Sequence, residues 1–318
     1  MQSVITATGS YLPSVIVTND ALALRVDTSD AWIRERTGIT QRHIAAQGEQ
    51  TSHLALRAAQ AALESAGYSA HKIDGIVVAT ATPDTTMPSV AAKVQAGLGI
   101  TKGAALDVAA ACTGFIYALS VAHGWIQTGI ATRVLVIGAE TMSRIIDWED
   151  RNTCVLFGDG AGAVILEAVP SGTRGIRAIT LEAAGEFAPL LGTHGGVSST
   201  QTAGTLFMQG QEVFRHGVEK MASVTLATLE KAGLTLADVD WLIPHQANAR
   251  MIRMIARQLK IAQEKCVITV AEQANTSAAT IPLALDIARR DGRLQPGNIV
   301  AMPALGAGLT WGCCVISW

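Results

Sequence analysis

Two kinds of hydrophobic pattern alternate along the chain. Apolar residues at helical spacing mark an amphipathic helix over 52–66, which ends at Gly67 and leads into a short apolar strand. The same order recurs over about 212–232, where a second helix ends at Gly233 ahead of another apolar strand. Near-continuous apolar runs, such as the one over 134–137, are typical of strands that are covered by helices on both faces. The pattern therefore predicts an α/β fold with buried central strands.

The two helix-to-strand segments also resemble each other in sequence. Leu-Glu-Ser-Ala-Gly over 63–67 returns as Leu-Glu-Lys-Ala-Gly over 229–233, which is 166 positions later. A second echo aligns 133–138 with 298–303 at an offset of 165. A helix that ends in Leu-Glu-x-Ala-Gly is common, so one match alone could be chance. Two matches at nearly one offset indicate a duplicated unit.

Composition supports one layered body made of two similar halves, which we expect to span 1–170 and 171–318. A chain of 318 residues with 49% hydrophobic and 16% charged residues can bury a large core, which excludes disorder and a coiled coil. The formal net charge is −2, and basic residues are spread among acidic ones. This leaves no basic surface of the kind that binds nucleic acid, so no such partner is expected.

The opening sequence and the cysteines favour a cytoplasmic protein. The first residues carry no basic region and turn at Gly9 and Pro13, so they predict a strand and not a signal peptide. No apolar run reaches the roughly 20 residues that a membrane span requires. Five cysteines at irregular spacing do not form a disulfide framework, and a reducing compartment fits best. Neither CxxC pairs nor zinc-ligand histidine spacing is present, so no metal is expected.

Cys112 lies where an apolar strand gives way to a helix. The segment over 107–115 reads Asp-Val-Ala-Ala-Ala-Cys-Thr-Gly-Phe, and small neighbours leave room for a substrate carbonyl beside the sulfur. Unpaired amides at a helix N-terminus favour the thiolate and can lower a cysteine pKa well below about 8.5. We therefore expect Cys112 to be a nucleophile that a thioester acylates. The alternative, a small buried hydrophobic residue, is our interpretation of the other cysteines, which are Cys154, Cys266, Cys313 and Cys314.

His245 and Asn275 are the candidate partners of the cysteine. His245 follows an apolar strand over 241–244, and Asn275 lies in a turn just before a helix. Both belong to the second half, so they could meet Cys112 where the halves pack together. Their hydrogen-bond donors would suit a thioester oxygen that gains charge when a malonyl group loses carbon dioxide. Taken singly, His245 could be an ordinary strand-end histidine and Asn275 a helix N-cap.

Four blocks of the sequence resemble the signature motifs of the β-ketoacyl-acyl-carrier-protein synthase III family. They follow the family's order and spacing over essentially the whole chain, and they are Ala-Ala-Cys-Thr-Gly over 110–114, Pro-His-Gln-Ala-Asn over 244–248, Gln-Ala-Asn-Thr-Ser over 273–277 and Leu-Gly-Ala-Gly-Leu-Thr-Trp-Gly over 305–312. The resemblance implies a thiolase-like α/β fold with α-β-α-β-α layers built from two duplicated halves. It also implies a homodimer.

The resemblance further implies a two-step acyl transfer. A short acyl-CoA, with acetyl-CoA the expected donor, would acylate Cys112, and malonyl-acyl-carrier protein would then decarboxylate and attack. The products would be a 3-oxoacyl-acyl-carrier protein, carbon dioxide and CoA, and the reaction would initiate fatty-acid synthesis. The oxyanion hole would use the backbone amides of Cys112 and Ala307, where many relatives have glycine at the second position. No cofactor is expected, because CoA and phosphopantetheine arrive with the substrates.

Candidate CoA contacts lie mainly in a short capped helix that the sequence predicts over 29–38. The resemblance places Trp32 at the adenine-stacking position and Arg36 and Thr37 at nucleotide contacts. It places Arg151 on the other face of the adenine and Asn248 near the pantetheine channel. An arginine and a tryptophan that flank a base form a favourable stack.

The helix after His245 carries a basic stripe. Its members recur at spacings of three, four and three and would suit an acidic carrier protein. An ordinary solvated helix face is the alternative. With the neighbouring Gln246, the expected carrier-protein contacts are Arg250, Arg253, Arg257 and Lys260.

The acyl pocket and the rival functions stay open at this stage. Met87 and Leu305 stand where familiar acetyl-preferring relatives often carry phenylalanine, so the donor could be longer. The nearest alternative is a related condensing enzyme that uses a longer or aromatic acyl-CoA in secondary metabolism. A thiolase would need a second catalytic cysteine, and a scaffold protein would not need Cys112. The glycine-rich segment over 157–163 leads into a strand, so it predicts close backbone packing and not a phosphate loop.

Overall fold

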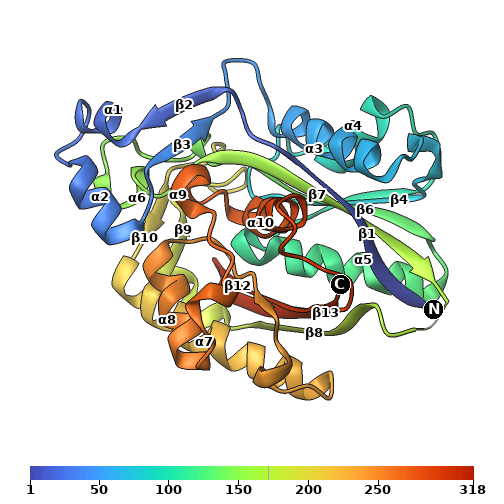
Figure 1. The fold of residues 1–318 in the computed structure, drawn as a ribbon. Helices are drawn as coiled ribbons and strands as arrows, with labels where there is room; N and C mark the ends of the chain where they lie inside the picture. Colours follow the sequence, from blue (N-terminus) through green and yellow to red (C-terminus); the bar gives the residue numbers. More distant parts are fainter. Residues whose placement is uncertain (171) are drawn as a thin grey trace.

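The chain folds into five layers that alternate between helices and sheets. The computed structural model describes residues 1–170 and 172–318. Figure 1 shows a pair of outer helices, the first sheet, a central pair of helices, the second sheet and a second outer pair. The α/β class and the α-β-α-β-α layering expected from the sequence are confirmed.

The first sheet takes its strands from the first part of the chain. Its order is β1-β7-β6-β4-β5, with the last three strands parallel to one another and the first two pairings antiparallel. The apolar run over 134–137 lies in the middle of this sheet and is fully buried, as its composition predicts. The strands are β1 (Gln2–Tyr11), β7 (Asp159–Val169), β6 (Arg133–Thr141), β4 (Gly75–Ala79) and β5 (Ala104–Val108).

The second sheet repeats this topology with one strand fewer. Its order is β11-β12-β13-β8, with a parallel β11–β12 pair and antiparallel pairings beyond it. The four strands thus match β4, β6, β7 and β1 of the first sheet in order and direction. The strands are β11 (Trp241–Leu242), β12 (Ile299–Gly306), β13 (Thr310–Ser317) and β8 (Gly175–Ala183).

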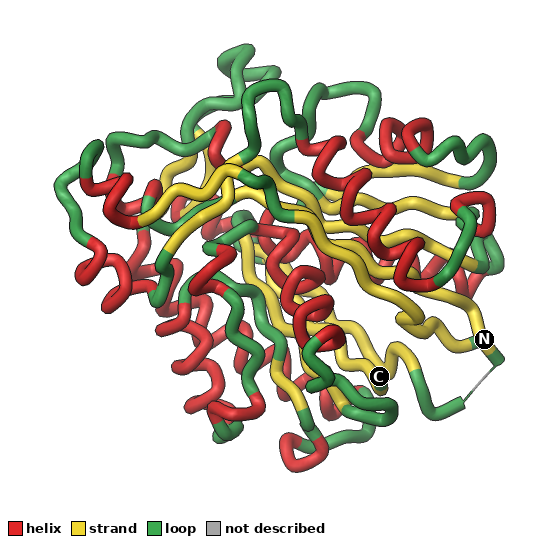
Figure 2. Tube along the Cα trace, turned by 45° about the horizontal axis from the view of Figure 1, so that its top comes forward, coloured by secondary structure: helices red, strands yellow, loops and turns green. Residues whose placement is uncertain are grey.

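Six helices form the three helical layers. Figure 2 shows helices on both outer sides of the strands and between them. Two cover the outer face of each sheet, and two lie between the sheets. The predicted helices over 52–66 and 212–232 are confirmed to within two residues at each end. The helices are α3 (Thr51–Ala66) and α4 (Val90–Gly97) outside the first sheet, α5 (Gly114–Thr128) and α10 (Thr280–Arg290) in the centre, and α7 (Gly210–Lys231) and α8 (Ala249–Leu259) outside the second sheet.

Shorter elements gather at one end of the layers, on the left in Figure 1. Two short turns of 3-10 helix, η2 and η7, precede the central helices and matter for the site. The elements at this end are β2 (Val15–Thr18), α1 (Asn19–Ala23), α2 (Asp30–Thr37), β3 (Gln41–Ile44), α6 (Arg151–Cys154), β9 (Leu191–Thr193), β10 (Leu206–Met208) and α9 (Val270–Gln273). The two turns are η2 (Ala111–Thr113) and η7 (Ser277–Ala279), which contact each other and strands of both sheets.

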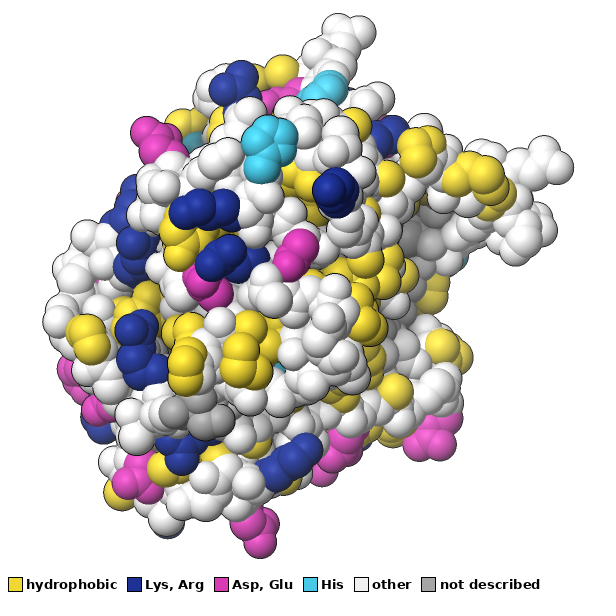
Figure 3. Space-filling view, turned by 90° about the vertical axis from the view of Figure 1, so that its right-hand side faces the viewer, with side chains coloured by type: hydrophobic (Ala, Val, Ile, Leu, Met, Phe, Trp, Pro, Cys, Tyr) yellow, Lys and Arg dark blue, Asp and Glu magenta, His cyan; other side chains and the backbone are white. Residues whose placement is uncertain are grey.

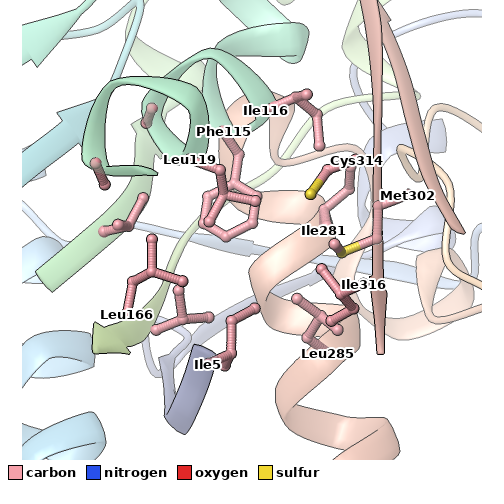
Figure 4. Packing of buried hydrophobic residues seen from close by; sticks show 14 of the residues in the cluster. Ile5, Phe115, Ile116, Leu119, Leu166, Ile281, Leu285, Met302, Cys314 and Ile316 are labelled. Atoms are coloured by element: carbon pink, nitrogen blue, oxygen red, sulfur yellow. The ribbon is translucent and has the colours of Figure 1, made fainter. Parts of the chain in front are cut away.

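The central helices join the two sheets through one hydrophobic core. Figure 4 shows side chains of α5 and α10 that meet side chains from both sheets. Because α10 comes from the second part of the chain and contacts β1 and β7, the second part completes the core of the first. The labelled residues are Ile5, Phe115, Ile116, Leu119, Leu166, Ile281, Leu285, Met302, Cys314 and Ile316.

An aspartate marks the duplicated unit in both sheets. The amide of Asp74 donates to the carbonyl of Arg133 at 3.0 Å, and its carboxylate accepts from the Arg133 amide at 2.8 Å. Asp240 makes the same two bonds with Ile299, at 2.9 and 2.8 Å. The sequence alignment of 133–138 with 298–303 was therefore wrong by one residue, since the structural partners of both aspartates are 166 positions apart.

Glycines let α10 and its η7 turn approach the first sheet closely. A Cβ on Gly162 of β7 would lie 2.6 Å from the backbone nitrogen of Leu283, and one on Gly138 of β6 would meet the carbonyl of Ala278. Only glycine fits such positions without a shift of the backbone. The interpretation of the glycine-rich segment over 157–163 as close backbone packing is confirmed.

The surface carries charges of both signs. Figure 3 shows basic and acidic side chains next to one another, with hydrophobic side chains between them, on the face at the right-hand end of Figure 1. Across residues 1–170 and 172–318, every helix is too short or too polar to cross a bilayer. All five cysteines are buried as free thiols.

Candidate active site

Cys112 occupies the turn η2 between β5 and α5. The residue before it, Ala111, has a left-handed backbone with φ of 46°. Thr113 ties the turn to β13, since its hydroxyl donates to the carbonyl of Thr310 at 2.9 Å. Gly306, at the end of β12, comes so close that a Cβ there would lie 2.7 Å from the backbone nitrogen of Cys112. The nucleophile candidate is thus held by backbone contacts from the opposite sheet.

His245 is held by backbone and side-chain bonds. It follows β11, and its amide donates to the carbonyl of Pro303 at 2.9 Å. Its Nδ1 lies 2.8 Å from Oγ1 of Thr280, which can also donate to the carbonyl of Ser277 at 3.0 Å. The Thr280 hydroxyl has one proton for these two acceptors. When it donates to Nδ1, the imidazole proton stands on Nε2.

Asn275 is fixed on both sides of its peptide. Its amide donates to the carbonyl of Leu156 at 2.9 Å, and its carbonyl accepts from Gly158 at 3.1 Å. The Oδ1 atom accepts from the amide of Ser277 at 2.9 Å. Because Oδ1 is occupied, the NH₂ group is the end that can donate into the site.

One cavity brings the three predicted residues together. Cys112, His245 and Asn275 line a cavity of about 80 Å³, together with Leu305 of the predicted acyl pocket. The elements that supply them come from both sheets, as expected for residues that meet where the halves pack. The arrangement places one thiol and two hydrogen-bond donors around a single small space.

Burial determines the protonation of the two titratable groups. Burial raises the pKa of the Cys112 thiol to about 12, because desolvation outweighs the opposite effect of the nearby Ser277 hydroxyl and Glu140 adds repulsion. The expectation that the helix N-terminus lowers this pKa is thus wrong, because desolvation outweighs it. Burial also lowers the pKa of His245 to about 3, so the imidazole is neutral near pH 7.

The groove outside the cavity contains most of the predicted CoA contacts. Trp32, Arg36, Thr37, Asn248 and Arg250 line a groove of about 600 Å³. It adjoins the inner cavity because both are bordered by Leu156, Met208, Gly210, Phe214 and Asn248.

Two arginines flank the indole of Trp32. The guanidinium carbon of Arg36 lies 4.8 Å from the ring centroid, and that of Arg151 lies 5.3 Å from it. Arg151 also donates to the carbonyl of Asp27 at 2.7 Å, which holds it beside the ring. The pair predicted to stack an adenine is therefore adjacent at the mouth of the groove.

The basic stripe on α8 faces outward. Arg250, Arg253 and Arg257 are exposed, and so is Lys260 at the helix end. Arg253 and Arg257 line a second groove of about 660 Å³, and Arg250 borders both grooves. The stripe thus continues from the CoA groove along the surface.

One predicted contact is wrong, and a second stays a prediction. Gln246 is only 1% exposed, and its side chain bonds to the carbonyls of Pro244 and Val267 and to the amide of Thr269. These bonds brace the chain after β11, so Gln246 does not reach a carrier protein. Met87 is 79% exposed on the loop after β4 and does not line the cavity, so this chain alone does not place it in the acyl pocket.

The sequence did not single out three polar residues behind the cavity, namely Ser277, Thr280 and Glu140. Glu140 lies at the end of β6 and is 0% exposed. A carboxyl group that directly follows an apolar central strand is costly to bury, and this was the available signal. Among the described residues, no group of three or more histidine, cysteine, aspartate or glutamate side chains is placed to hold a metal ion.

Comparisons with known proteins agree with this geometry. Residues 106–185 match the family described as 3-oxoacyl-[acyl-carrier-protein] synthase III, and residues 229–318 match the family of its C-terminal part. The β-ketoacyl-[acyl-carrier-protein] synthase III of Dinoroseobacter shibae is 54% identical over 321 residues, which cover 100% of this chain and 99% of the relative.

Solved structures match over the same length. The 3-oxoacyl-[acyl-carrier-protein] synthase III of Aquifex aeolicus has a TM-score of 0.95 at 43% identity, covering 99% of this chain and 100% of that chain. The priming β-ketosynthase of the R1128 polyketide pathway has a TM-score of 0.93 at 33% identity, covering 99% and 96%. With such identity over its full length and the same fold, the chain belongs to the β-ketoacyl-acyl-carrier-protein synthase III family.

Proposed function

We propose that the protein condenses a short acyl-CoA, preferably acetyl-CoA, with malonyl-acyl-carrier protein and so initiates fatty-acid synthesis. The observation that carries this proposal is the shared cavity of Cys112, His245 and Asn275 at the inner end of the groove that Trp32 and Arg36 border. A thioester entering along the groove would present its carbonyl to the thiol. Family membership supports the same reaction.

In the first half-reaction, Cys112 attacks the thioester carbonyl of the acyl-CoA. The developing oxyanion is held by the amides of Cys112 and Ala307. The close approach of Gly306 to the Cys112 amide supports this pair, because Ala307 follows directly in the chain. CoA leaves, and the acyl group stays on the sulfur.

In the second half-reaction, malonyl-carrier protein loses carbon dioxide beside the acyl group. The Nε2 proton of His245 and the NH₂ group of Asn275 hold the thioester oxygen while the enolate forms. A neutral imidazole suits this task, and Thr280 supports it when its hydroxyl donates to Nδ1. The enolate carbon then attacks the acyl group and gives the 3-oxoacyl product.

The outer groove would bind the nucleotide and the carrier protein. We propose that adenine stacks between Trp32 and Arg151, with Arg36, Thr37 and Asn248 along the path to the cavity. The exposed arginines of α8 would meet the acidic carrier protein. They are Arg250, Arg253 and Arg257, with Lys260 at the helix end.

Cavity size supports a short acyl group. The inner cavity measures about 80 Å³, whereas an engineered cavity that holds benzene measures about 150 Å³. An acetyl group fits such a space more readily than a benzoyl or octanoyl group does. One alternative is a condensing enzyme that uses longer or aromatic donors in secondary metabolism. The similarity to a priming ketosynthase of a polyketide pathway supports this alternative.

Intact-protein mass spectrometry tests these assignments. The protein is mixed briefly with acetyl-, butyryl-, octanoyl- or benzoyl-CoA, and the modified residue is mapped by peptide digestion. We expect acetyl or short-chain labelling confined to Cys112. Labelling by only octanoyl- or benzoyl-CoA would establish the alternative, and no labelling by any donor would overturn both.

We further propose a homodimer in the cytoplasm and an origin of the chain by duplication of a half, with halves 1–170 and 171–318. The dimer is supported by β5, an edge strand of the first sheet whose apolar residues are half-buried. Five free cysteines suit a reducing compartment. Light scattering after size-exclusion chromatography should give the mass of two chains, and the mass of one chain would overturn the dimer.

A further inference from the structure

The hydroxyl of Ser277 lies near both the Cys112 thiol and a buried carboxyl group that the proposed reaction leaves unused. The turn η7 packs against η2, so the hydroxyl of Ser277 lies near the Cys112 thiol, and this hydroxyl donates to Oε1 of Glu140 at 3.0 Å. A hydroxyl that donates to a carboxylate keeps its lone pairs for the thiol. The protons can therefore all point the same way, from sulfur to carboxylate.

Glu140 is held in this place by neutral donors. Its carboxylate accepts from the Ala81 amide at 3.1 Å, from the Thr80 hydroxyl at 3.2 Å and from the Thr82 hydroxyl at 2.5 Å. None of the ion pairs among residues 1–170 and 172–318 includes it. Burial raises the pKa of Glu140 to about 7, so both protonation states are accessible near neutral pH.

The surroundings of Glu140 contain few other titratable groups. Cys112 faces it from η2, and the loop after β4 presents threonines and an amide. On the neighbouring strand β7, the carboxylate of Asp159 is turned to the amides of Ala45 and Ser143. His245 contacts Thr280, the residue that follows η7, and makes no hydrogen bond to Glu140.

We propose that Glu140 takes up the thiol proton through Ser277 when Cys112 is acylated, keeps it in the acyl-enzyme and returns it after condensation. This inference rests on the proposed function. Glu140 then acts as a proton store, a buried group that holds the proton of the nucleophile while Cys112 is acylated. Ser277 lies beside the reacting sulfur, whereas Glu140 acts through Ser277.

The proton balance of the first half-reaction is simple. The S–H bond of Cys112 breaks as its proton passes to Ser277, and the Ser277 proton passes to Glu140, which becomes neutral. The thiolate forms a bond to the acyl carbon, and the bond from this carbon to the CoA sulfur breaks. CoA leaves as a thiolate and takes one proton from water.

The second half-reaction reverses the transfer. The malonyl carboxylate leaves as carbon dioxide, and its electron pair forms the enolate and then the new carbon–carbon bond. Cys112 is released as a thiolate and regains the Glu140 proton through Ser277. One proton from water is consumed per turnover, by CoA, which balances the overall reaction.

The transfer also keeps negative charges apart. While Cys112 is acylated, Glu140 is neutral, so the malonyl carboxylate and the enolate do not face a second buried anion. Two buried anions repel each other strongly, because the protein interior weakens the interaction between charges much less than water does. His245 is a poor store for this proton, because burial lowers its pKa to about 3.

Single-turnover acylation measured against pH tests the proton store. With acetyl-CoA and wild-type enzyme, we expect the acylation rate to rise through about pH 7 as Glu140 ionises. In Glu140→Gln the rate at pH 7.5 should fall by about 10²-fold and lose this step. Alkylation of Cys112 by iodoacetamide should show the same difference without CoA.

Two further measurements separate a proton store from a merely structural role. Pre-acetylated Glu140→Gln enzyme should condense with malonyl-carrier protein within about threefold of the wild-type rate, since Glu140 takes no part in that bond formation. Equal losses in both half-reactions would overturn the proton store. Asp159→Asn neutralises another buried carboxyl group on β7 and should keep the step near pH 7.

A second variant guards against misfolding of Glu140→Gln. Ser277→Ala breaks the path and leaves Glu140 in place, and Ala111 shows that alanine adopts the same left-handed backbone in the equivalent turn. This variant should also lose the step near pH 7. If the wild-type enzyme is acylated and both variants keep the wild-type dependence of the acylation rate on pH, the proton store is overturned. If the wild-type enzyme is not acylated at all, the proposed function is overturned instead.

Discussion

The turns η2 and η7 are the same structure used for different chemistry. They lie 166 positions apart, and each begins with a left-handed residue, Ala111 with φ of 46° and Ser277 with φ of 50°. Each leads into a central helix. A glycine from a strand of the opposite sheet lies against each turn, Gly306 against η2 and Gly138 against η7.

The difference between the turns lies in their side chains. The second residue is Cys112 in η2 and Ala278 in η7, whereas the first is Ala111 in η2 and Ser277 in η7. Ala278 is buried, and a Cβ on Gly114 would lie 3.4 Å from its methyl group, so the two turns face each other. The same backbone turn therefore carries the candidate nucleophile in one half and polar side chains beside it in the other.

Removing the thiol from η2 should have the largest effect on activity. Cys112→Ala should abolish acyl-enzyme formation and lower condensation by about 10³-fold or more, which mass spectrometry and a product assay would measure. Cys266→Ala, a control at a buried thiol of the second half, should keep the full mass increase. An acyl-enzyme that persists in Cys112→Ala would place the nucleophile elsewhere.

Removing the donors beside η7 should affect the other half-reaction. In His245→Ala and in Asn275→Ala, decarboxylative condensation should fall by about 10²–10³-fold, because the enolate oxygen loses a hydrogen bond. Acylation by acetyl-CoA should change far less. Single-turnover assays of both steps would decide, and a parallel loss of acylation would contradict the division of labour between the turns.

The glycine contact on η2 can be tested by one methyl group. In Gly306→Ala the new Cβ would lie 2.7 Å from the Cys112 nitrogen, which should lower the free energy of unfolding by about 1–3 kcal/mol and slow acylation. Gly124→Ala on α5 is the matched control, because nothing lies within 4 Å of its new Cβ. Equal urea unfolding curves for the two variants would show that the close approach is not a constraint.

Acid should lower the free energy of unfolding through His245, which is buried as a neutral imidazole. Burial lowers its pKa from 6.5 to about 3, so the unfolded chain binds a proton that the folded chain does not between these values. Stability from this group is therefore lost as the pH falls from about 6.5 toward 3, by about 2 kcal/mol at pH 5. His245→Gln should show a smaller loss between pH 7.5 and 5 in urea unfolding, and an unchanged loss would remove His245 as the cause.

Reversing charges on α8, far from both turns, should have the smallest effect on activity. Arg253→Glu with Arg257→Glu should raise the apparent KM for malonyl-carrier protein about fivefold at low salt, and less at high salt. Acylation by acetyl-CoA should be unchanged, since neither residue lines the CoA groove. Arg177→Glu on β8 is a control for net charge, and an equal KM change there would remove the special role of α8.

Much of this comparison was visible in the sequence. The repeat offset, the layered α/β class and the nucleophile candidate follow from local patterns, because strand-to-helix turns and helix-ending glycines are encoded by neighbouring residues. The one-residue error in aligning 133–138 arose because apolar strands look alike at any register. Only the aspartate bonds of Asp74 and Asp240 fixed it.

Other features depend on contacts that no local pattern contains. Gln246 was expected among the carrier-protein contacts beside the basic stripe, yet its side-chain amide bonds to three buried backbone groups. The pKa of Cys112 was expected to be low from its helix position alone, whereas the depth of burial decides it. Glu140 was missed because its partners come from the loop after β4 and from η7, far away in the chain.

The position of α10 between the sheets also bears on how the chain is made. A ribosome completes β1 and β7 long before it reaches Thr280–Arg290, so one apolar face of the first sheet is synthesised without its cover. Exposed apolar faces of partly made chains favour aggregation and attract chaperones. We therefore expect a vulnerable interval in biosynthesis that ends only when α10, and then β12 and β13, have left the ribosome and the two sheets close around the helix.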